Sequence, residues 1–257
     1  MRGKGWSVFP DVYVDYHLLD DQLILQTSAT GGDRFSSFSG RFFSRPFTYE
    51  GEFGHALERV RTMIGARGSI AGRFRYDFQG GYARWAHSVL DGMSTSSLLW
   101  TPATSTAIVT AFIPAQYDYA YNLLFAELDY GWNSESVTVD GRLAYHYTNI
   151  TGNGAFTPAA FTGFIRPAYN WGGRLKAGLE ASWSTDRKAL VAVSEGMPIS
   201  EYRLPGWVDL GVFAEYRFTH RFGFWAKGGN LLNQAVQRIP LVAEAGMYFT
   251  AGIVLNF

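Results

Sequence analysis

Apolar and polar residues alternate with a period of two along most of this chain, in segments of roughly ten residues. In the segment RLKAGLEASWS (174–184), leucine, alanine or tryptophan occupies every second position, and mostly lysine, glutamate or serine lies between them. The same alternation continues to the last residue of the sequence, Phe257. This is the pattern of β-strands whose two faces meet different surroundings. The sequence therefore predicts an all-β fold.

The pattern predicts about eleven strands, separated by connections that alternate in length. Short connections follow the odd strands, and long ones, near 31–56, 88–118, 149–158, 187–206 and 231–245, follow the even strands. Short turns at one end and long loops at the other are typical of a barrel that crosses an outer membrane. We therefore expect residues 1–257 to form one domain, an antiparallel up-and-down transmembrane β-barrel. The expected strands are 7–16, 22–30, 57–70, 73–87, 119–131, 135–148, 159–171, 174–186, 207–218, 222–230 and 246–257.

Composition excludes several classes of protein. The chain has 22 basic and 22 acidic residues and a formal net charge of zero, which argues against a nucleic-acid partner. It has no cysteine, so disulfides and thiolate metal sites are excluded. No stretch approaches the roughly 20 apolar residues of a membrane-spanning helix. The first residues lack the apolar core and cleavage site of a signal peptide.

A soluble sandwich or lipocalin-like barrel would also alternate, with its apolar face packed inside. Two features favour lipid on that face instead. It is rich in alanine, which fills an interior poorly, and aromatic residues recur near the strand ends, as in the girdles of membrane barrels. We therefore expect the bilayer of a bacterial outer membrane to cover the apolar face. The charged residues would then line a wet lumen: Arg59, Arg61, Arg67, Arg73, Arg75, Asp77, Asp140, Arg142, Lys176, Glu180, Asp209, Glu215, Arg217 and Lys227.

The parity of the strands predicts that this chain is the carboxyl-terminal part of a larger barrel, with the rest preceding it or supplied as a separate chain. Counting back from the last strand places the first strand's start on the extracellular side, whereas single-chain bacterial barrels have an even number of strands. A twelfth strand at 106–112 is the alternative. It would place the long 31–56 connection in the periplasm.

The stretches WVDLGVFAEYRFTHRFGFWAKGGNLLNQ (207–234) and GMYFTAGIVLNF (246–257) resemble the end of TonB-dependent receptors, the active importers of Gram-negative outer membranes. Earlier hairpins such as ARGSIAGRFRYDFQGGYARW resemble barrels of this type from the Bacteroidetes. The matching positions are Asp209, Leu210, Tyr216, Asn230, Leu231, Leu232, Asn233, Gly252, Leu255 and Phe257.

The resemblance implies ligand capture by long loops, followed by rearrangement of a plug driven by TonB. It also implies recognition of the last strand by the barrel-assembly machinery, with Phe249, Ile253, Leu255 and Phe257 as the signal. The sequence departs from the family in lacking a plug domain, a TonB-box-like segment and the usual Pro-Gly-Arg before the last strand.

Two further groups of residues have alternative interpretations. The aromatic-rich loop around Phe42, Phe43, Phe47 and Tyr49 could bind a sugar or an apolar ligand, or fold on itself over the barrel mouth. The arginines between 59 and 75 could bind an anion or a plug, or balance the charges of Asp77, Asp129 and Glu127 across strands.

Catalysis is not expected. His146 shares its strand with Asp140, but six residues of strand separate them by about 20 Å, too far for a dyad. No histidine pair has metal-ligand spacing, and no cofactor is expected.

The sequence thus favours a nutrient- or ligand-uptake barrel. The alternatives are a scaffolding barrel, which would hold a surface lipoprotein or other outer-membrane subunits, and a plugless passive pore.

Overall fold

The computed structural model describes residues 8–19, 22–34, 56–100, 107–150, 155–192, 199–238 and 242–255, and its regular elements there are all strands. Eleven of them form one antiparallel sheet in the order β1-β2-β3-β4-β7-β8-β9-β10-β13-β14-β15. Their bounds are β1 Asp11–Leu18, β2 Leu23–Arg34, β3 Ala56–Ile70, β4 Phe74–His87, β7 Tyr121–Asn133, β8 Val137–Thr148, β9 Phe161–Trp171, β10 Leu175–Ser184, β13 Trp207–Arg217, β14 Phe222–Gly229 and β15 Tyr248–Leu255. No helix within these ranges is long and apolar enough to cross a membrane.

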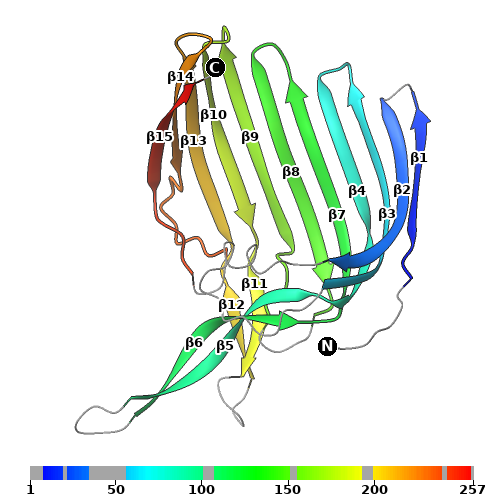
Figure 1. Ribbon diagram of the computed structural model, residues 1–257, viewed down its shortest axis with the longest axis vertical. Coiled ribbons are helices and arrows are strands. Elements are labelled where there is room, and N and C mark those ends of the chain that lie inside the picture. Colours follow the sequence, from blue (N-terminus) through cyan, green and yellow to red (C-terminus); the bar gives the residue numbers. More distant parts are fainter. Residues whose placement is uncertain are drawn as a thin grey trace.

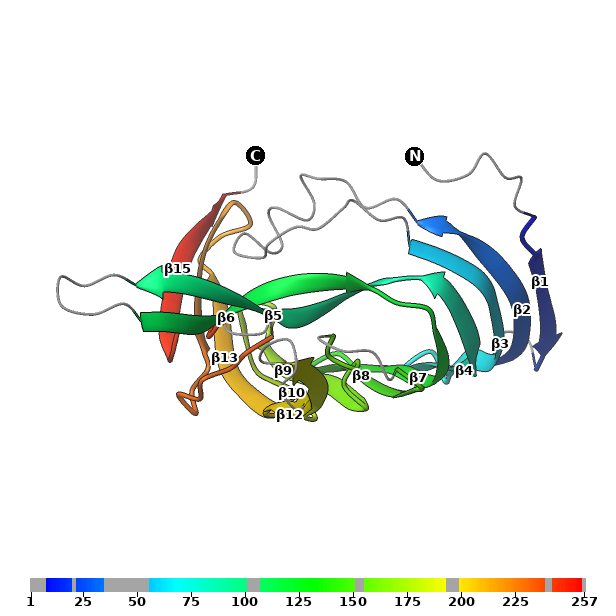
Figure 2. The same ribbon diagram turned by 90° about the horizontal axis from the view of Figure 1, so that it is seen from below.

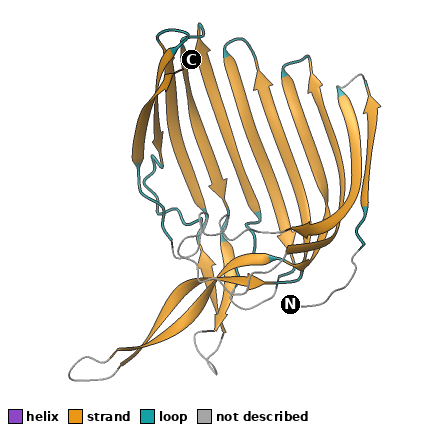
Figure 3. Ribbon diagram, viewed as in Figure 1, coloured by secondary structure: helices purple, strands orange, loops and turns teal. Residues whose placement is uncertain are grey.

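The sheet is curved into an open trough, with β1 at one edge and β15 at the other (Figures 1 and 2). Short turns join the strands at one end, and the long connections gather at the other (Figure 3). Among the described residues, no strand pairs with the outer edge of β1 or of β15. The predicted strands and their up-and-down order are therefore confirmed, and the sheet they form is not closed.

Tight turns explain the close hairpin pairing at the short end. Ala71 and Gly72 both have positive φ angles, 52° and 65°, and Gly172 and Gly173 repeat this with 57° and 72°. Two successive residues of positive φ form the turn whose twist matches paired strands. Each turn is closed by one backbone hydrogen bond, from Arg73 to Ile70 (3.1 Å) and from Arg174 to Trp171 (3.2 Å).

Cross-strand register joins the apolar residues of all eleven strands into one face, called here the apolar face. Two of its rows run Val12, Ala29, Thr62, Tyr82, Leu124, Tyr147 and Leu175, Tyr216, Phe224, Ile253. On β4 this face is uncharged from Phe74 to Tyr82, and Arg84 follows as the next residue on the same side. Aromatic residues border the face at both ends.

The height of the apolar face suits a bilayer. On β9, Phe161 lies at the loop end and Trp171 at the turn end, and ten residues at about 3.3 Å each separate them by about 33 Å along the strand. For a strand tilted by the usual 35–45°, this corresponds to about 25 Å along the membrane normal, which is the thickness of the apolar band of outer-membrane barrels.

The opposite face lies inside the trough, and is called here the concave face. At its loop end Ala83 (0% exposed), Leu123 and Phe125 (4%) form a buried cluster with Trp85 and Tyr121. On the apolar face, by contrast, Ile64 is 70% exposed. Of the two faces of the eleven-stranded sheet, the concave one therefore carries a packed cluster near the loops, and the apolar face has no protein cover among the described residues.

The connections 88–118 and 187–206 contain hairpins that the sequence pattern did not predict. The strands β5 Val89–Trp100 and β6 Ala107–Asp118 pair only with each other, as do β11 Arg187–Ala192 and β12 Ile199–Leu204. The β5–β6 hairpin lies at the loop end of the trough (Figure 1) and extends across that end when it is viewed from below (Figure 2). Its sequence is uncharged from Met93 to Tyr117. No charged residues alternate with apolar ones there, so the period of two that predicts a strand is not visible.

The alternative of a twelfth wall strand at 106–112 is wrong. β4 pairs directly with β7, and β6 belongs to a separate two-stranded sheet.

Two adjacent glycines provide a test of the strand packing. A Cβ atom at Gly81 would clash with the carbonyl oxygen of Thr62, whereas one at Gly80 would make ordinary contacts of 3.5 Å or more. We predict that Gly81→Ala lowers the free energy of unfolding by about 2 kcal/mol and that Gly80→Ala changes it little. Urea unfolding of the full chain in lipid vesicles measures both. Equal losses of unfolding free energy in the two variants would contradict the observed register of β3 and β4.

Candidate functional site

The concave face carries nearly all of the residues predicted to line a lumen. By strand register it holds Arg61, Arg67, Arg75, Asp77, Asp140, Arg142, Lys176, Glu180, Asp209, Glu215, Arg217 and Lys227. The register therefore places these ions on one wall. That the wall encloses a lumen remains a prediction.

Strand register does not assign the other two predicted residues, Arg73 and Arg59, to this wall. Arg73 belongs to the short turn between β3 and β4, because β4 begins at Phe74. Arg59 is the extra residue of a β-bulge in β3, where Glu58 pairs with Trp85 and Val60 with Arg84. A bulge leaves its extra residue outside the regular alternation, so counting by two does not assign Arg59 to either face.

Glu180 joins three strands of the wall. Its Oε1 accepts a hydrogen bond from Arg166 on β9 (2.8 Å), and its Oε2 pairs with Lys227 Nζ on β14 (2.9 Å). The Glu180 side chain is 26% exposed, so the water that would screen these charges is partly excluded. One carboxylate thus bridges two cations that are far apart in sequence.

A second network lies on β7 and β8. Arg142 donates to Glu127 at 2.6 Å and lies 3.6 Å from Asp129, and His146 Nε2 is 3.3 Å from the other oxygen of Glu127. His146 therefore contacts Glu127, while Arg75 pairs with Asp140 at 2.9 Å. Arg67 and Arg75 thus have acids on other strands, but these acids are Asp15 and Asp140, and not the Asp77, Asp129 or Glu127 that the charge-balancing interpretation of the sequence named.

Acidic residues also face each other. Asp77 on β4 and Asp129 on β7 are direct register partners, and Asp77 accepts a hydrogen bond from Gln26 (3.2 Å). Arg67, the register partner of Asp77 on its other side, forms its ion pair with Asp15 on β1 at 2.7 Å. Like charges directly opposite each other destabilise a strand pair, so this position is less well compensated than its neighbours.

The NLLN element (230–233) forms the turn that leads out of β14. Asn230 and Asn233 have positive φ angles, 47° and 50°, which asparagine tolerates better than most residues. The Asn230 side chain donates to the carbonyls of Gln234 (2.8 Å) and Ala245 (3.2 Å), and Asn233 Oδ1 accepts from the Met247 backbone N–H (3.1 Å). These bonds hold both ends of the connection to β15.

The same connection places Arg238 against the wall. Its guanidinium pairs with Asp209 (3.0 Å) and Glu244 (2.7 Å) and lies 4.3 Å from the centroid of the Trp207 ring. Arg187 donates to the Arg238 carbonyl at 2.7 Å. The loop end of the concave face therefore combines charged side chains with an aromatic ring.

Two hollows follow from this arrangement. One of about 350 Å³ is lined by Phe164, Glu180, Lys227 and Tyr248, over a floor that includes Gly211. A wider one of about 620 Å³ lies closer to the loops, and its lining includes Arg142, His146, Arg187, Arg238 and Trp207. Both are large enough for a small ligand. Aromatic rings and paired charges could contact a polar ligand there.

Sequence reasoning missed Arg166 and Arg238. Arg166 lies between Ile165 and Pro167 and could have been found by the alternation along β9. Arg238 lies outside any strand, so no periodic signal identifies it.

The remaining predicted residues have varied outcomes. Phe249, Ile253 and Leu255 lie on the apolar face of the edge strand β15, and their exposed fractions are 70, 62 and 57%. Phe257, Phe42, Phe43, Phe47 and Tyr49 lie outside the described residues. Within the described ranges, no group of three or more potential metal-ligating side chains occurs.

Comparison with solved structures identifies the class of fold. The siderophore receptor PirA from Acinetobacter baumannii matches 97% of this chain with a TM-score of 0.67 and 12% identity. The outer-membrane ferripyoverdine receptor of Pseudomonas aeruginosa, bound to ferripyoverdine, matches 97% with a TM-score of 0.66 and 12% identity. The copper transporter OprC matches 95% with a TM-score of 0.61 and 13% identity.

The fold is therefore that of outer-membrane receptor barrels, which confirms the predicted fold class. The matches cover 41, 33 and 39% of those three proteins, so this chain spans well under half of their length. No protein-family model matches the sequence, and neither does any curated protein. These neighbours are receptors and transporters rather than enzymes. An origin in the Bacteroidetes remains a prediction.

The bridging position of Glu180 gives a second test. Glu180→Gln leaves Arg166 and Lys227 without their acid, whereas Glu215→Gln disrupts only the pair with Arg217 on the same strand. We predict that Glu180→Gln lowers the free energy of unfolding by about 1 kcal/mol more than Glu215→Gln. The difference should shrink in about 1 M salt, where charges are screened over about 3 Å. Identical losses at low salt would contradict the bridging role.

Proposed function

We propose that this chain forms part of the wall of a TonB-dependent-receptor-type barrel, which takes up a nutrient or other ligand across a Gram-negative outer membrane. The observation that carries this proposal is the segregation of the two faces. Hydrocarbon would cover the uncharged apolar face, and the paired ions of the concave face would border a wet passage. The fold likeness to a siderophore receptor, a ferripyoverdine receptor and a copper transporter supports the same assignment.

The open edges support a larger barrel. Each unpaired backbone N–H or C=O in hydrocarbon costs several kcal/mol, so neither β1 nor β15 can border lipid without a partner strand. We propose that further strands, from the same protein or from a second chain, join these edges. By analogy with outer-membrane barrels, we propose that the end with the long loops lies outside the cell and that the short turns lie in the periplasm.

In this proposal the hollows at the loop end receive the ligand. Arg187, Arg238 and Trp207 lie there, where the long connections meet the wall. A plug would occupy the trough against the paired ions, and TonB would supply the energy for its movement. A surface lipoprotein or another outer-membrane subunit is a candidate partner for the loops.

Electrical conductance separates uptake from passive passage. The protein as its gene encodes it, purified and inserted into planar bilayers in KCl, should conduct little because a plug closes it. Moderate urea, which unfolds a small domain before the barrel, should open a conductance that disappears on its removal. A steady open pore without urea would overturn the plugged-importer proposal in favour of a passive pore. No conductance in either condition would favour a scaffolding barrel.

Phe257 gives a separate prediction. We expect Phe257→Ala to reduce the amount of folded protein in the outer membrane several-fold while total synthesis is unchanged, because the assembly machinery would lose its signal. Phe224→Ala, an aromatic truncation on the apolar face of the neighbouring strand β14, is the matched control. Immunoblots of membrane fractions measure both. Normal membrane levels of the Phe257→Ala protein would contradict the role assigned to this residue.

A further inference from the structure

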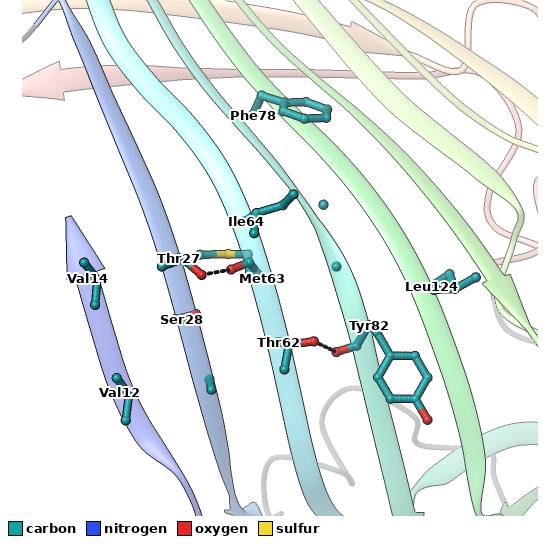
Figure 4. Close-up of a pocket in the computed structure, with 13 residues that line it drawn as sticks. Val12, Val14, Thr27, Ser28, Thr62, Met63, Ile64, Phe78, Tyr82 and Leu124 are labelled. Atoms are coloured by element: carbon teal, nitrogen blue, oxygen red, sulfur yellow. Dashed lines mark hydrogen bonds between the residues drawn. The ribbon is translucent and has the colours of Figure 1, made fainter. Parts of the chain in front are cut away.

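The apolar face has a groove near the β1 edge of the sheet, called here the outer groove. It has a volume of about 680 Å³ and lies across β1, β2, β3, β4 and β7 (Figure 4). Small side chains form its floor, among them Ala29 and Gly80, and larger ones such as Ile64, Phe78 and Leu124 stand beside them. The hollow therefore comes from the alternation of small and large residues on neighbouring strands.

The hydroxyl groups in the outer groove are bonded within the protein. Thr27 Oγ1 donates to the Met63 carbonyl (3.1 Å), and Thr62 Oγ1 donates to the Tyr82 carbonyl (3.5 Å), as Figure 4 shows. The Tyr82 hydroxyl donates to Asn122 Oδ1 (2.7 Å), beyond the lining. With their hydroxyls turned back to the backbone, both threonines can present methyl groups to the hollow. A site for a polar ligand would instead keep such donors free.

The absence of charge in the lining of the outer groove also argues against a polar ligand. The lining contains no acidic or basic residue. The row of the apolar face that crosses the groove also continues without charge beyond it, from Leu124 to Tyr147 on β8. Its surroundings are thus the surface that, under the proposed function, faces hydrocarbon.

We propose that the outer groove holds one acyl chain of an outer-membrane lipid more persistently than the rest of the apolar face does. A flexible, unbranched hydrocarbon chain can follow a shallow hollow that crosses five strands, and it needs no hydrogen bond there. Burying it replaces loose lipid contacts by close contacts with Ile64, Phe78 and Leu124. The proposal rests on the proposed membrane location of the sheet.

Photochemical labelling tests the proposal that an acyl chain binds in the outer groove. The full chain is placed in phosphatidylcholine vesicles that contain a small fraction of phosphatidylcholine with a diazirine on one acyl chain. We expect labelled peptides from β2–β4 to exceed those from β10–β13 several-fold. The double variant Ala29→Leu/Gly80→Leu fills the groove, and a Cβ at Gly80 makes no close contact, so it should still fold. It should abolish the excess, while Ala177→Leu, elsewhere on the apolar face, should leave it unchanged.

Each other result has a distinct meaning. Uniform labelling over the apolar face, or an excess that persists in the filled variant, would overturn the lipid site and leave the membrane location intact. A native-state crosslink from the groove to another protein would identify a protein contact and also overturn it. Absence of labelling anywhere on the apolar face would contradict the proposed function itself.

Discussion

Cross-strand register is the constraint on which the rest of this structure depends. Side chains alternate along a strand, so a slip of one residue between neighbours would exchange the faces of every strand beyond it. From β1 to β15 the pairing keeps Val14, Ile64, Leu179 and Phe249 on one side and the ion pairs on the other. The bulges between β2, β3 and β4 are confined to the loop end of these strands, so they do not interrupt the register of the apolar rows.

The ions of the concave face mostly neutralise one another across strands. Glu180 binds two cations, Glu127 contacts Arg142 and His146, and Arg75 and Arg67 each have an acid on another strand. A wall of this kind tolerates water and a polar neighbour without attracting one sign of charge strongly. Selectivity for a ligand would then depend on the loop end, where Arg187, Arg238 and Trp207 come together.

The sheet could be predicted strand by strand because its two faces differ so strongly in polarity. Each predicted wall strand corresponds to an observed one, with ends that differ by a few residues. The hairpins β5–β6 and β11–β12 could not be predicted in this way, because the first is almost uncharged and the second is short. Phe156, Ala189 and Leu204 bury the second hairpin's own small core, a long-range contact that no local period encodes.

The residues of the candidate site could also be predicted where they lie on regular strands, because their charged side chains alternate with apolar ones. Alternation gave the face of the ions that lie on regular strands, and it does not assign a face to Arg59 in its bulge or to Arg73 in its turn. It gave the face of each residue but not its partner: Arg67 pairs with Asp15 on β1, although Asp77 lies directly opposite it. Partner choice depends on side-chain reach across several strands, which sequence spacing alone does not contain.

Hydrocarbon cover of the apolar face can be measured directly, since the chain has no cysteine and single cysteines can carry a spin label. The label would be placed in turn at each position of β10, from Leu175 to Ser184, in the full chain reconstituted in lipid vesicles. Collision rates with oxygen, which concentrates in lipid, should then peak at Leu175, Ala177, Leu179, Ala181 and Trp183. Collisions with a water-soluble nickel complex should peak at the positions between them. Collision rates with the opposite phase, or without a period of two along β10, would contradict hydrocarbon cover of the apolar face.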